Sequence, residues 1–164
     1  MEKSELVVVL EKNLARQLEW IKSADSKATF VFAMDTAMLG VLAAIAPKTA
    51  ASWTTSQTVT ASFAVFFGFV SFAFLSIAAF PRTLGPKGSV IFSSGIAQRS
   101  IDQFKQAMVS LTVEAYLEDL SEQCHRNAEI ASSKFTWVQR AVLCTYIAIV
   151  PWVLALWLLY NTAR

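Results

Sequence analysis

Three long stretches of the chain are almost free of charge, and the segments between them mix polar and apolar residues. Residues 28–46 contain one charged side chain, Asp35, whereas residues 60–80 and 141–160 contain none. Each stretch has about the 20 residues that a helix needs to cross roughly 30 Å of hydrocarbon. The pattern therefore predicts an all-α membrane protein with three transmembrane helices.

The segments before the first and third spans have the spacing of amphipathic helices. Apolar positions recur there at about 3.6 residues per turn, with polar residues on the other faces. No proline or glycine separates either segment from the span that follows it. We therefore expect two long helices that continue from the spans into helical extensions, and we expect these extensions to form a bundle. The positions that define the two apolar faces are Leu6, Leu10, Leu14, Gln17, Ile21, Ala24 and Ala28 in the first helix, and Val113, Leu117, Leu120, Cys124, Ala131, Phe135 and Val138 in the second.

The distribution of lysine and arginine predicts the orientation. Twelve of the 14 cations lie before the first span or between the second and third, and the other two are Lys48 and Arg164. Cytoplasmic segments are enriched in such residues. The order along the chain is therefore a cytoplasmic amphipathic helix (1–27), a periplasmic loop (47–59), a cytoplasmic loop with helices (81–140) and a periplasmic tail (161–164). We expect a multi-pass protein of the bacterial inner membrane, with a cytoplasmic N-terminus and a periplasmic C-terminus.

Composition supports the membrane class and argues against several functions. The hydrophobic fraction is 55% and the charged fraction 16%, against about 45–50% and 25% in soluble domains. The net charge is only +2, and the basic residues are interleaved with acidic ones, which argues against nucleic-acid binding. One histidine and two cysteines without ligand spacing predict no metal site. Phosphate-binding, dinucleotide-binding and metalloprotease motifs are absent from the sequence, so we do not expect an enzyme.

Small residues mark candidate packing faces inside the membrane, where helices associate through close approach rather than through hydrophobicity. In the second span, Ala64 and Gly68 form a pair of small residues four positions apart. The candidate face of the first span contains Ala33, Ala37, Gly40 and Ala44.

Asp35 lies nearly opposite that small-residue face, about 12 Å past Lys27 at 1.5 Å per residue. A carboxylate at such a depth costs roughly 2.5–3.5 kcal/mol on insertion scales, so it should face protein or water. One interpretation is a hydrogen-bonded or protonated residue that fixes helix register. A second is a carboxylate that lines a pore or an oligomer contact. A third is a shorter span with a water defect.

Several polar side chains fall on or beside the apolar faces of the two long helices. Asp25 is one, and Gln123, Asn127 and Lys134 are others. Because buried polar groups need partners, these residues either satisfy one another, for example Lys134 with Asp25, or surround a polar ligand. Arg82, at the end of the second span, suits either a phosphate or lipid headgroups.

Five segments of the chain together form a recognisable set. They are WIKSADSKA (20–28), MDTAMLG (34–40), FPR (80–82), VIFSSGIA (90–97) and EDLSEQCHRNAEIASSKF (118–135). In these segments, which extend over nearly the whole chain, the sequence resembles the membrane effectors of Pycsar, the bacterial pyrimidine-cyclase antiphage system.

The resemblance implies a function that composition and spacing do not. A companion pyrimidine cyclase supplies cCMP or cUMP, and the membrane protein responds by oligomerising and impairing the inner membrane, so that the infected cell stops growing or dies. The expected partners are thus the lipid bilayer, further copies of the chain and the cyclic nucleotide, with no other cofactor.

We chose the candidate ligand-binding residues by position. A cation suits the phosphate, an amide suits the base edge, and Phe92 could stack on the ring. The Ser-Ser-Gly segment resembles turns that offer backbone N–H groups to phosphates. The candidates are Asp25, Ser26, Lys27, Arg82, Phe92, Ser94, Gly95, Gln123, His125, Asn127 and Lys134.

Two other functions fit the same pattern. One is a membrane anchor or accessory subunit that forms no pore and whose cytoplasmic bundle binds a protein partner. The other is a holin-like protein that acts without a ligand.

Overall fold

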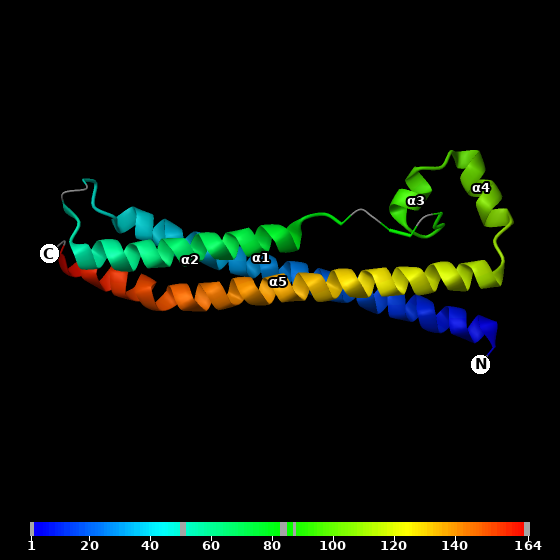
Figure 1. Cartoon of the computed structure of the whole chain (residues 1–164), viewed down its shortest axis with the longest axis horizontal. Helices are drawn as coiled ribbons and strands as arrows, with labels where there is room; N and C mark the ends of the chain where they lie inside the picture. Colours follow the sequence, from blue (N-terminus) through cyan, green and yellow to red (C-terminus); the bar gives the residue numbers. More distant parts are fainter. Residues whose placement is uncertain (1, 50–51, 83–84, 87, 163–164) are drawn as a thin grey trace. The chain divides into compact units, whose positions relative to one another are not determined.

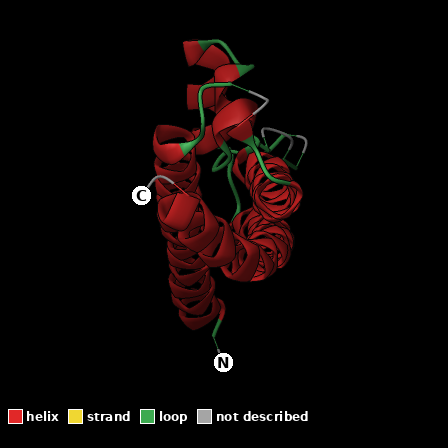
Figure 2. Ribbon diagram, turned by 90° about the vertical axis from the view of Figure 1, so that its left-hand side faces the viewer, coloured by secondary structure: helices red, strands yellow, loops and turns green. Residues whose placement is uncertain are grey.

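The computed structural model describes residues 2–49, 52–82, 85–86 and 88–162. These residues form helices and loops, with no strand among them, which confirms the all-α class (Figures 1 and 2). Lys87 and the last two positions of the predicted tail, one of which is Arg164, lie outside the described residues. The helices are α1 (Lys3–Ile45), α2 (Thr55–Ala79), α3 (Ser93–Ala97), α4 (Ile101–Val109) and α5 (Val113–Thr162).

The chain divides into two compact units. Unit 1 contains Met1–Ala24 and Pro81–Lys134, and unit 2 contains Asp25–Phe80 and Phe135–Arg164. Helices α1 and α5 each contribute one part to unit 1 and one part to unit 2. The predicted continuity of each amphipathic segment with its span is therefore confirmed.

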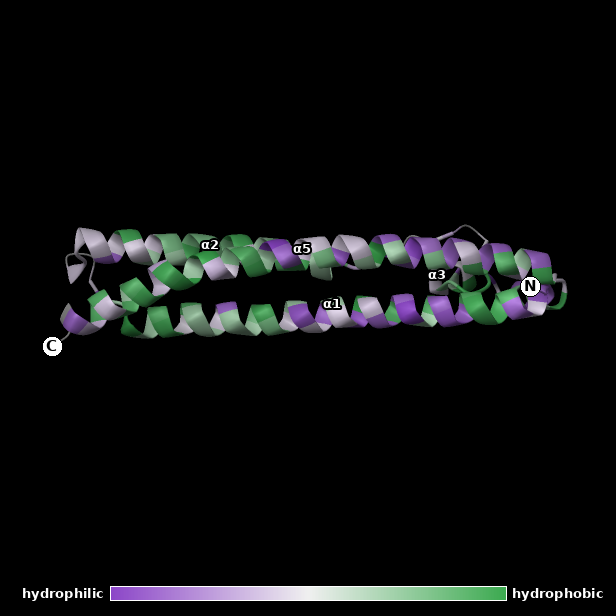
Figure 3. Ribbon diagram, turned by 90° about the horizontal axis from the view of Figure 1, so that it is seen from below, coloured by the Kyte–Doolittle hydropathy of each residue, from purple (hydrophilic) through white to green (hydrophobic). Residues whose placement is uncertain are grey.

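Helices α1, α2 and α5 each contain a window long and apolar enough to cross a membrane, as predicted. Hydrophobic colour predominates along α2 and along the parts of α1 and α5 that belong to unit 2 (Figure 3). Helix α2 begins at Thr55, inside the predicted 47–59 loop, because Thr54 and Gln57 form a reciprocal capping box. Pro151 lies within α5 without ending it.

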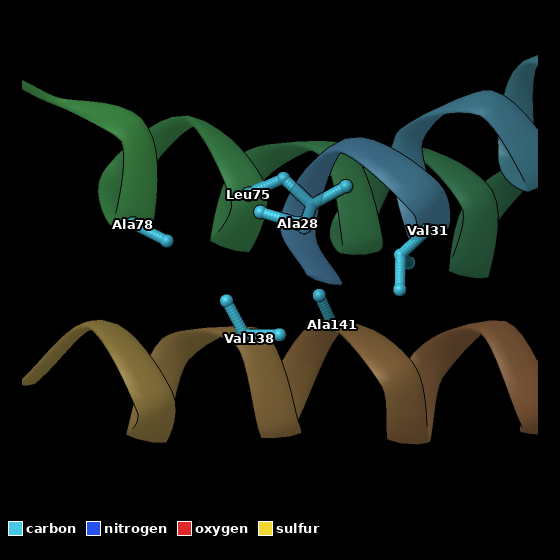
Figure 4. Packing of buried hydrophobic residues seen from close by; sticks show 6 residues of the cluster. All are labelled: Ala28, Val31, Leu75, Ala78, Val138 and Ala141. Atoms are coloured by element: carbon cyan, nitrogen blue, oxygen red, sulfur yellow. The ribbon is translucent and has the colours of Figure 1, made fainter. Parts of the chain in front are cut away.

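In unit 2, α2 runs antiparallel to the neighbouring parts of α1 and α5 (Figure 1). Their inward faces meet in two clusters of mainly small side chains, which allow the backbones to approach closely. The first cluster contains Ala28, Val31, Leu75, Ala78, Val138 and Ala141 (Figure 4), and the second contains Leu42, Ala61, Ala64, Ala155 and Leu159.

Polar contacts tie the first part of α1 to α5 in unit 1. The Tyr116 hydroxyl donates to Glu11 Oε1 at 2.9 Å, and Lys3 pairs with Glu114. Burial, followed by the Glu11 carboxylate, raises the pKa of Tyr116, whereas the hydrogen bond from Lys3 lowers the pKa of Glu114. The predicted apolar face of α5 is buried at Leu120, Cys124, Ala131 and Val138, whereas Val113, at its start, is 50% exposed.

In the segment between α2 and α5, Ser100 caps the start of α4. Ser100 Oγ accepts a hydrogen bond from Gln103 N at 3.2 Å, and Gln103 Oε1 accepts one from Ser100 N at 2.9 Å. This reciprocal pair starts α4. No residue of α4 is buried, and Val109 is 90% exposed.

Candidate functional site

The polar centre of unit 1 is Ser89, a residue that is only 3% exposed. Its hydroxyl oxygen accepts from the backbone N–H groups of Ile91 at 3.1 Å and Phe92 at 2.8 Å. Gln123 Nε2 of α5 donates to the same oxygen at 3.2 Å. Ser89 therefore shapes the turn before α3 and connects it to α5.

Two further contacts hold the same turn. Val90 N donates to Asp119 Oδ2 of α5 at 2.8 Å. The Arg99 guanidinium donates to the carbonyl oxygens of Ser89, at 2.8 Å, and Gly88. The backbone N–H groups of residues 90–92 are thus already bonded to Asp119 and Ser89. The prediction that this turn offers its N–H groups to a phosphate is wrong for these three groups, and the Ser-Ser-Gly segment itself is the short helix α3.

Two of the predicted ligand residues have clear packing roles. Gly95 is buried, and a Cβ atom placed on it would lie 2.5 Å from the carbonyl oxygen of Ser89. The Phe92 ring lies so close to Gly85 that a side chain at residue 85 would overlap it. Stacking of Phe92 on a nucleotide would therefore displace the ring from Gly85. Ser94, between these two residues, is partly buried.

Three candidates form a buried polar edge of α5 in unit 1. Gln123, Asn127 and Lys134 are 2%, 8% and 9% exposed, as their position beside the apolar face predicts. The His125 side chain, by contrast, is 79% exposed and lies 3.8 Å from Glu129 Oε1. Its place on the outer face argues against a role in a buried ligand site.

Arg82 contributes a partly bonded guanidinium to unit 1. Its Nη2 atom donates to Ser133 Oγ at 2.9 Å. Its Nη1 atom is buried and has no hydrogen-bond partner in the described part of the chain. Because a guanidinium presents a planar fork of donors, one bonded edge and one unpaired nitrogen suit an added anionic oxygen.

Asp25, Ser26 and Lys27 of α1 are exposed. The expectation that Asp25 points into the bundle is wrong, because Ala24 and Ala28 occupy the inward face and one residue turns an α-helix by about 100°. The Lys27 ammonium lies 5.0 Å from the centre of the Phe135 ring, which is a cation–π distance. The predicted pairing of Asp25 with Lys134 stays a prediction.

Asp35 is 1% exposed and lies between the helices of unit 2. Thr145 Oγ1 donates to Asp35 Oδ1 at 2.9 Å and is also 3.2 Å from Ser71 Oγ. The carboxyl group therefore faces protein, and the hydroxyl of Thr145 links it to Ser71. Asp35 Oδ2, however, is buried without a hydrogen-bond partner in the described residues.

The two small-residue faces differ. Ala64 and Gly68 of α2 are buried, and a Cβ atom at Gly68 would lie 3.4 Å from Leu39. This agrees with the packing prediction for α2. The four residues of the α1 face are exposed, with open space around Gly40. Within one chain the α1 packing prediction is wrong, because Val31, Asp35 and Leu42 occupy the inward face instead.

A polar cleft of about 260 Å³ opens beside the Ser89 turn. Three acidic residues line it, namely Glu118, Asp119 and Glu122. None of the eleven predicted ligand residues does so. The acidic wall disfavours an anionic phosphate. Among the described residues, no group of three or more His, Cys, Asp or Glu side chains could hold a metal ion.

The residues that sequence reasoning missed in unit 1 are Ser89, Arg99 and Asp119. Two sequence signals could have found Ser89 and Asp119, whereas none points to Arg99. Ser89 follows Gly88, and a Gly-Ser pair is typical of a turn in which a serine hydroxyl can bond nearby N–H groups. Asp119 is four residues before Gln123, so both side chains leave α5 on the same face.

Cys124 provides a test of the packing of unit 1. Its Sγ lies 3.4 Å from the carbonyl oxygen of Leu10, and burial raises the pKa of the thiol. Since the thiolate is the nucleophile, we expect Cys124 to react much more slowly with maleimide at pH 8 than an exposed thiol. The measurement uses Cys144→Ala. The comparison is Ser121→Cys, an exposed position one turn earlier, made with both native cysteines replaced by alanine. Equal rates would contradict the packing described here.

Comparison with known proteins assigns the chain to a family. The model of the family described as Pycsar effector protein domain, PycTM, matches residues 9–160. No match was found among curated proteins or among solved structures. The family match covers parts of all five helices, and so includes both the apolar spans and the Ser89 turn. The chain therefore belongs to the Pycsar effector family, a membrane branch of antiphage defence.

Proposed function

We propose that this protein binds a cyclic pyrimidine mononucleotide, cCMP or cUMP, assembles into oligomers and impairs the bacterial inner membrane, so that an infected cell stops growing or dies. The N-terminus and the segment 81–140 lie in the cytoplasm, and the C-terminus lies in the periplasm. The observation on which the proposal chiefly rests is the family match across residues 9–160 of a chain with three apolar helices.

The need for several copies follows from the fold of unit 2. Its three helices bury small side chains against one another in two clusters, which leaves no aqueous passage for ions inside one chain at those positions. Ala33, Ala37, Gly40 and Ala44 remain exposed on α1. Such a face suits close contact with a helix of another copy. We therefore attribute the impairment of the membrane to an assembly of several copies of the chain.

The phosphate of the nucleotide is assigned to Arg82. The Nη1 atom of Arg82 is buried and lacks a partner among the described residues, while Ser133 holds the other end of the guanidinium. The Gln123 amide already donates a hydrogen bond to Ser89. If Gln123 binds the edge of the nucleotide base, that hydrogen bond must be exchanged for one to the base. A ligand changes the assembly only if it binds the assembled state more tightly than the resting state.

The direct test is dye leakage from vesicles that contain the purified protein, with cCMP, cUMP or cAMP added. We expect leakage only with a cyclic pyrimidine nucleotide. Equal leakage with and without nucleotide would favour the holin-like function. Absence of leakage under all conditions would favour the accessory-subunit function and reject the proposal.

Replacement of Arg82 by glutamine is expected to weaken nucleotide binding by about tenfold to a hundredfold, because a hydrogen bond to a charged group contributes roughly 1.5–3 kcal/mol. Isothermal titration calorimetry in detergent measures the affinity. Lys105→Gln is the matched control, since Lys105 is an exposed cation of α4. If both variants bind as the wild type does, the phosphate is not held by Arg82.

A further inference from the structure

Unit 2 contains an open groove between α1 and α5 that the proposed function does not use. Its volume is about 350 Å³. From Ser26 to Met34, its α1 wall extends about 12 Å at 1.5 Å per residue. Both walls belong to helices long and apolar enough to cross a membrane. The walls are formed mainly by Phe30, Val31 and Met34 of α1 and by Val138, Val142 and Tyr146 of α5.

The one charged residue that lines the groove lies at one end of it. Ser26 and Lys27 line it at the start of the α1 wall, and no acidic residue lines it. The Lys27 ammonium is exposed and lies over the Phe135 ring, 5.0 Å from its centre. A cation held against a ring face keeps N–H donors that can point away from the ring. The site thus combines an apolar trough with a single fixed positive charge.

This combination complements an amphiphile with an anionic head and a hydrocarbon chain. In a bilayer such molecules are the anionic phospholipids, whose phosphate lies at the level where lysine side chains reach the interface. The rim residues Phe30 and Tyr146 are 70% and 62% exposed, so an acyl chain can enter from the side. A helix of a second copy fits less well, because none of the four exposed small residues of α1 lines the groove.

We propose that the groove between α1 and α5 holds one acyl chain of an anionic phospholipid, whose headgroup phosphate binds the Lys27 ammonium. The lipid would fill the open side of the three-helix unit at the end where Lys27 lies. This inference depends on the apolar helices of unit 2 and is independent of nucleotide binding by Arg82.

Native mass spectrometry of the detergent-purified chain tests the proposal. The protein is mixed with equal amounts of phosphatidylglycerol and phosphatidylcholine that have the same acyl chains. We expect one retained lipid per chain, with about fivefold preference for phosphatidylglycerol, since one lysine near a headgroup contributes about 1 kcal/mol. Lys27→Gln should remove the preference. Val142→Trp fills the groove and should lower retention of both lipids. Phe30→Ala removes an exposed part of the wall and should have the same effect.

Matched controls make each result interpretable. Arg140→Gln removes an exposed cation that lies over Trp137 and does not line the groove. Phe69→Ala removes a phenylalanine of α2 that is 62% exposed and also lies outside the groove. Both should behave as the wild type.

Three results would overturn the proposal. If Lys27→Gln keeps the preference for phosphatidylglycerol, the headgroup does not bind Lys27. If Val142→Trp and Phe30→Ala retain lipid as the wild type does, the acyl chain lies elsewhere. If Val142→Trp changes the proportion of dimers in the same spectra while lipid retention is unchanged, a second copy occupies the groove instead.

Discussion

Replacement of Gly95 by alanine is expected to destabilise unit 1 by about 1–3 kcal/mol, the usual cost of overpacking. The added Cβ would lie 2.5 Å from the carbonyl oxygen of Ser89, and a backbone atom cannot rotate away as the end of a side chain can. Helix propensity alone predicts the opposite sign, because alanine is about 1 kcal/mol more favourable than glycine inside a helix. The sign of the change therefore separates a steric requirement at Gly95 from a simple helical preference.

Amide hydrogen exchange in detergent locates this effect. The N–H groups of Val90, Ile91 and Phe92 are bonded to Asp119 and Ser89, so they should exchange faster once α3 is pushed from the turn. Ala97→Val is the control, since it changes an exposed residue at the end of the same helix. Unchanged exchange at residues 90–92 in Gly95→Ala would show that the turn does not depend on the close approach of α3.

The main helices of this chain can be predicted from the sequence because each rests on a local pattern. Residues 60–80 and 141–160 lack charge over the length of a bilayer, and that requirement does not depend on any neighbour. Likewise, Ser100 and Gln103 have the spacing of a capping box, which is complete within one turn of helix. The early start of α2 follows from the same kind of signal at Thr54 and Gln57.

The candidate site was harder to predict, because its contacts join residues far apart in sequence. Ser89 and Gln123 are 34 residues apart, and Val90 and Asp119 are 29 apart. A period of 3.6 places Gln123 and Asn127 near the inward face of α5 but does not identify what faces them. The Ser-Ser-Gly pattern alone therefore predicts a ligand-binding turn, whereas in the structure its glycine lets α3 approach Ser89.

Helix packing shows a similar limit. Small residues on α1 and α2 look alike in sequence, yet Ala64 and Gly68 are buried while Ala33 and Ala37 are exposed. The inward face of α1 in unit 2 instead contains Val31, Asp35 and Leu42. In a membrane, positions that face lipid and positions that pack against another helix are both apolar, so hydrophobicity cannot distinguish them. Asp35 is the exception, since its depth and charge predict a protein or water contact.

Replacement of Asp35 by leucine is expected to stabilise unit 2 and to abolish nucleotide-dependent leakage. A carboxyl at the centre of a span costs roughly 2.5–3.5 kcal/mol. The one hydrogen bond that it accepts within the described part of the chain, from Thr145, offsets about 1 kcal/mol of this cost. Thr145 would keep Ser71 and the carbonyl oxygen of Ala141 within hydrogen-bond distance. The difference is a gain of about 2 kcal/mol, measured as a higher midpoint of thermal unfolding in detergent.

A residue that lowers stability is expected to serve another task. Asp35 Oδ2, which has no hydrogen-bond partner among the residues that the structure describes, is suited to meet water or another copy when the helices separate. Asp35→Asn, which keeps an acceptor at the Oδ1 position, should preserve more leakage than Asp35→Leu. Thr36→Leu is the control, because Thr36 is the exposed neighbour of Asp35 and its hydroxyl donates to the carbonyl oxygen of Phe32 in its own helix. A lower unfolding midpoint in Asp35→Leu would assign Asp35 to helix register instead. Wild-type leakage from that variant would remove Asp35 from the mechanism.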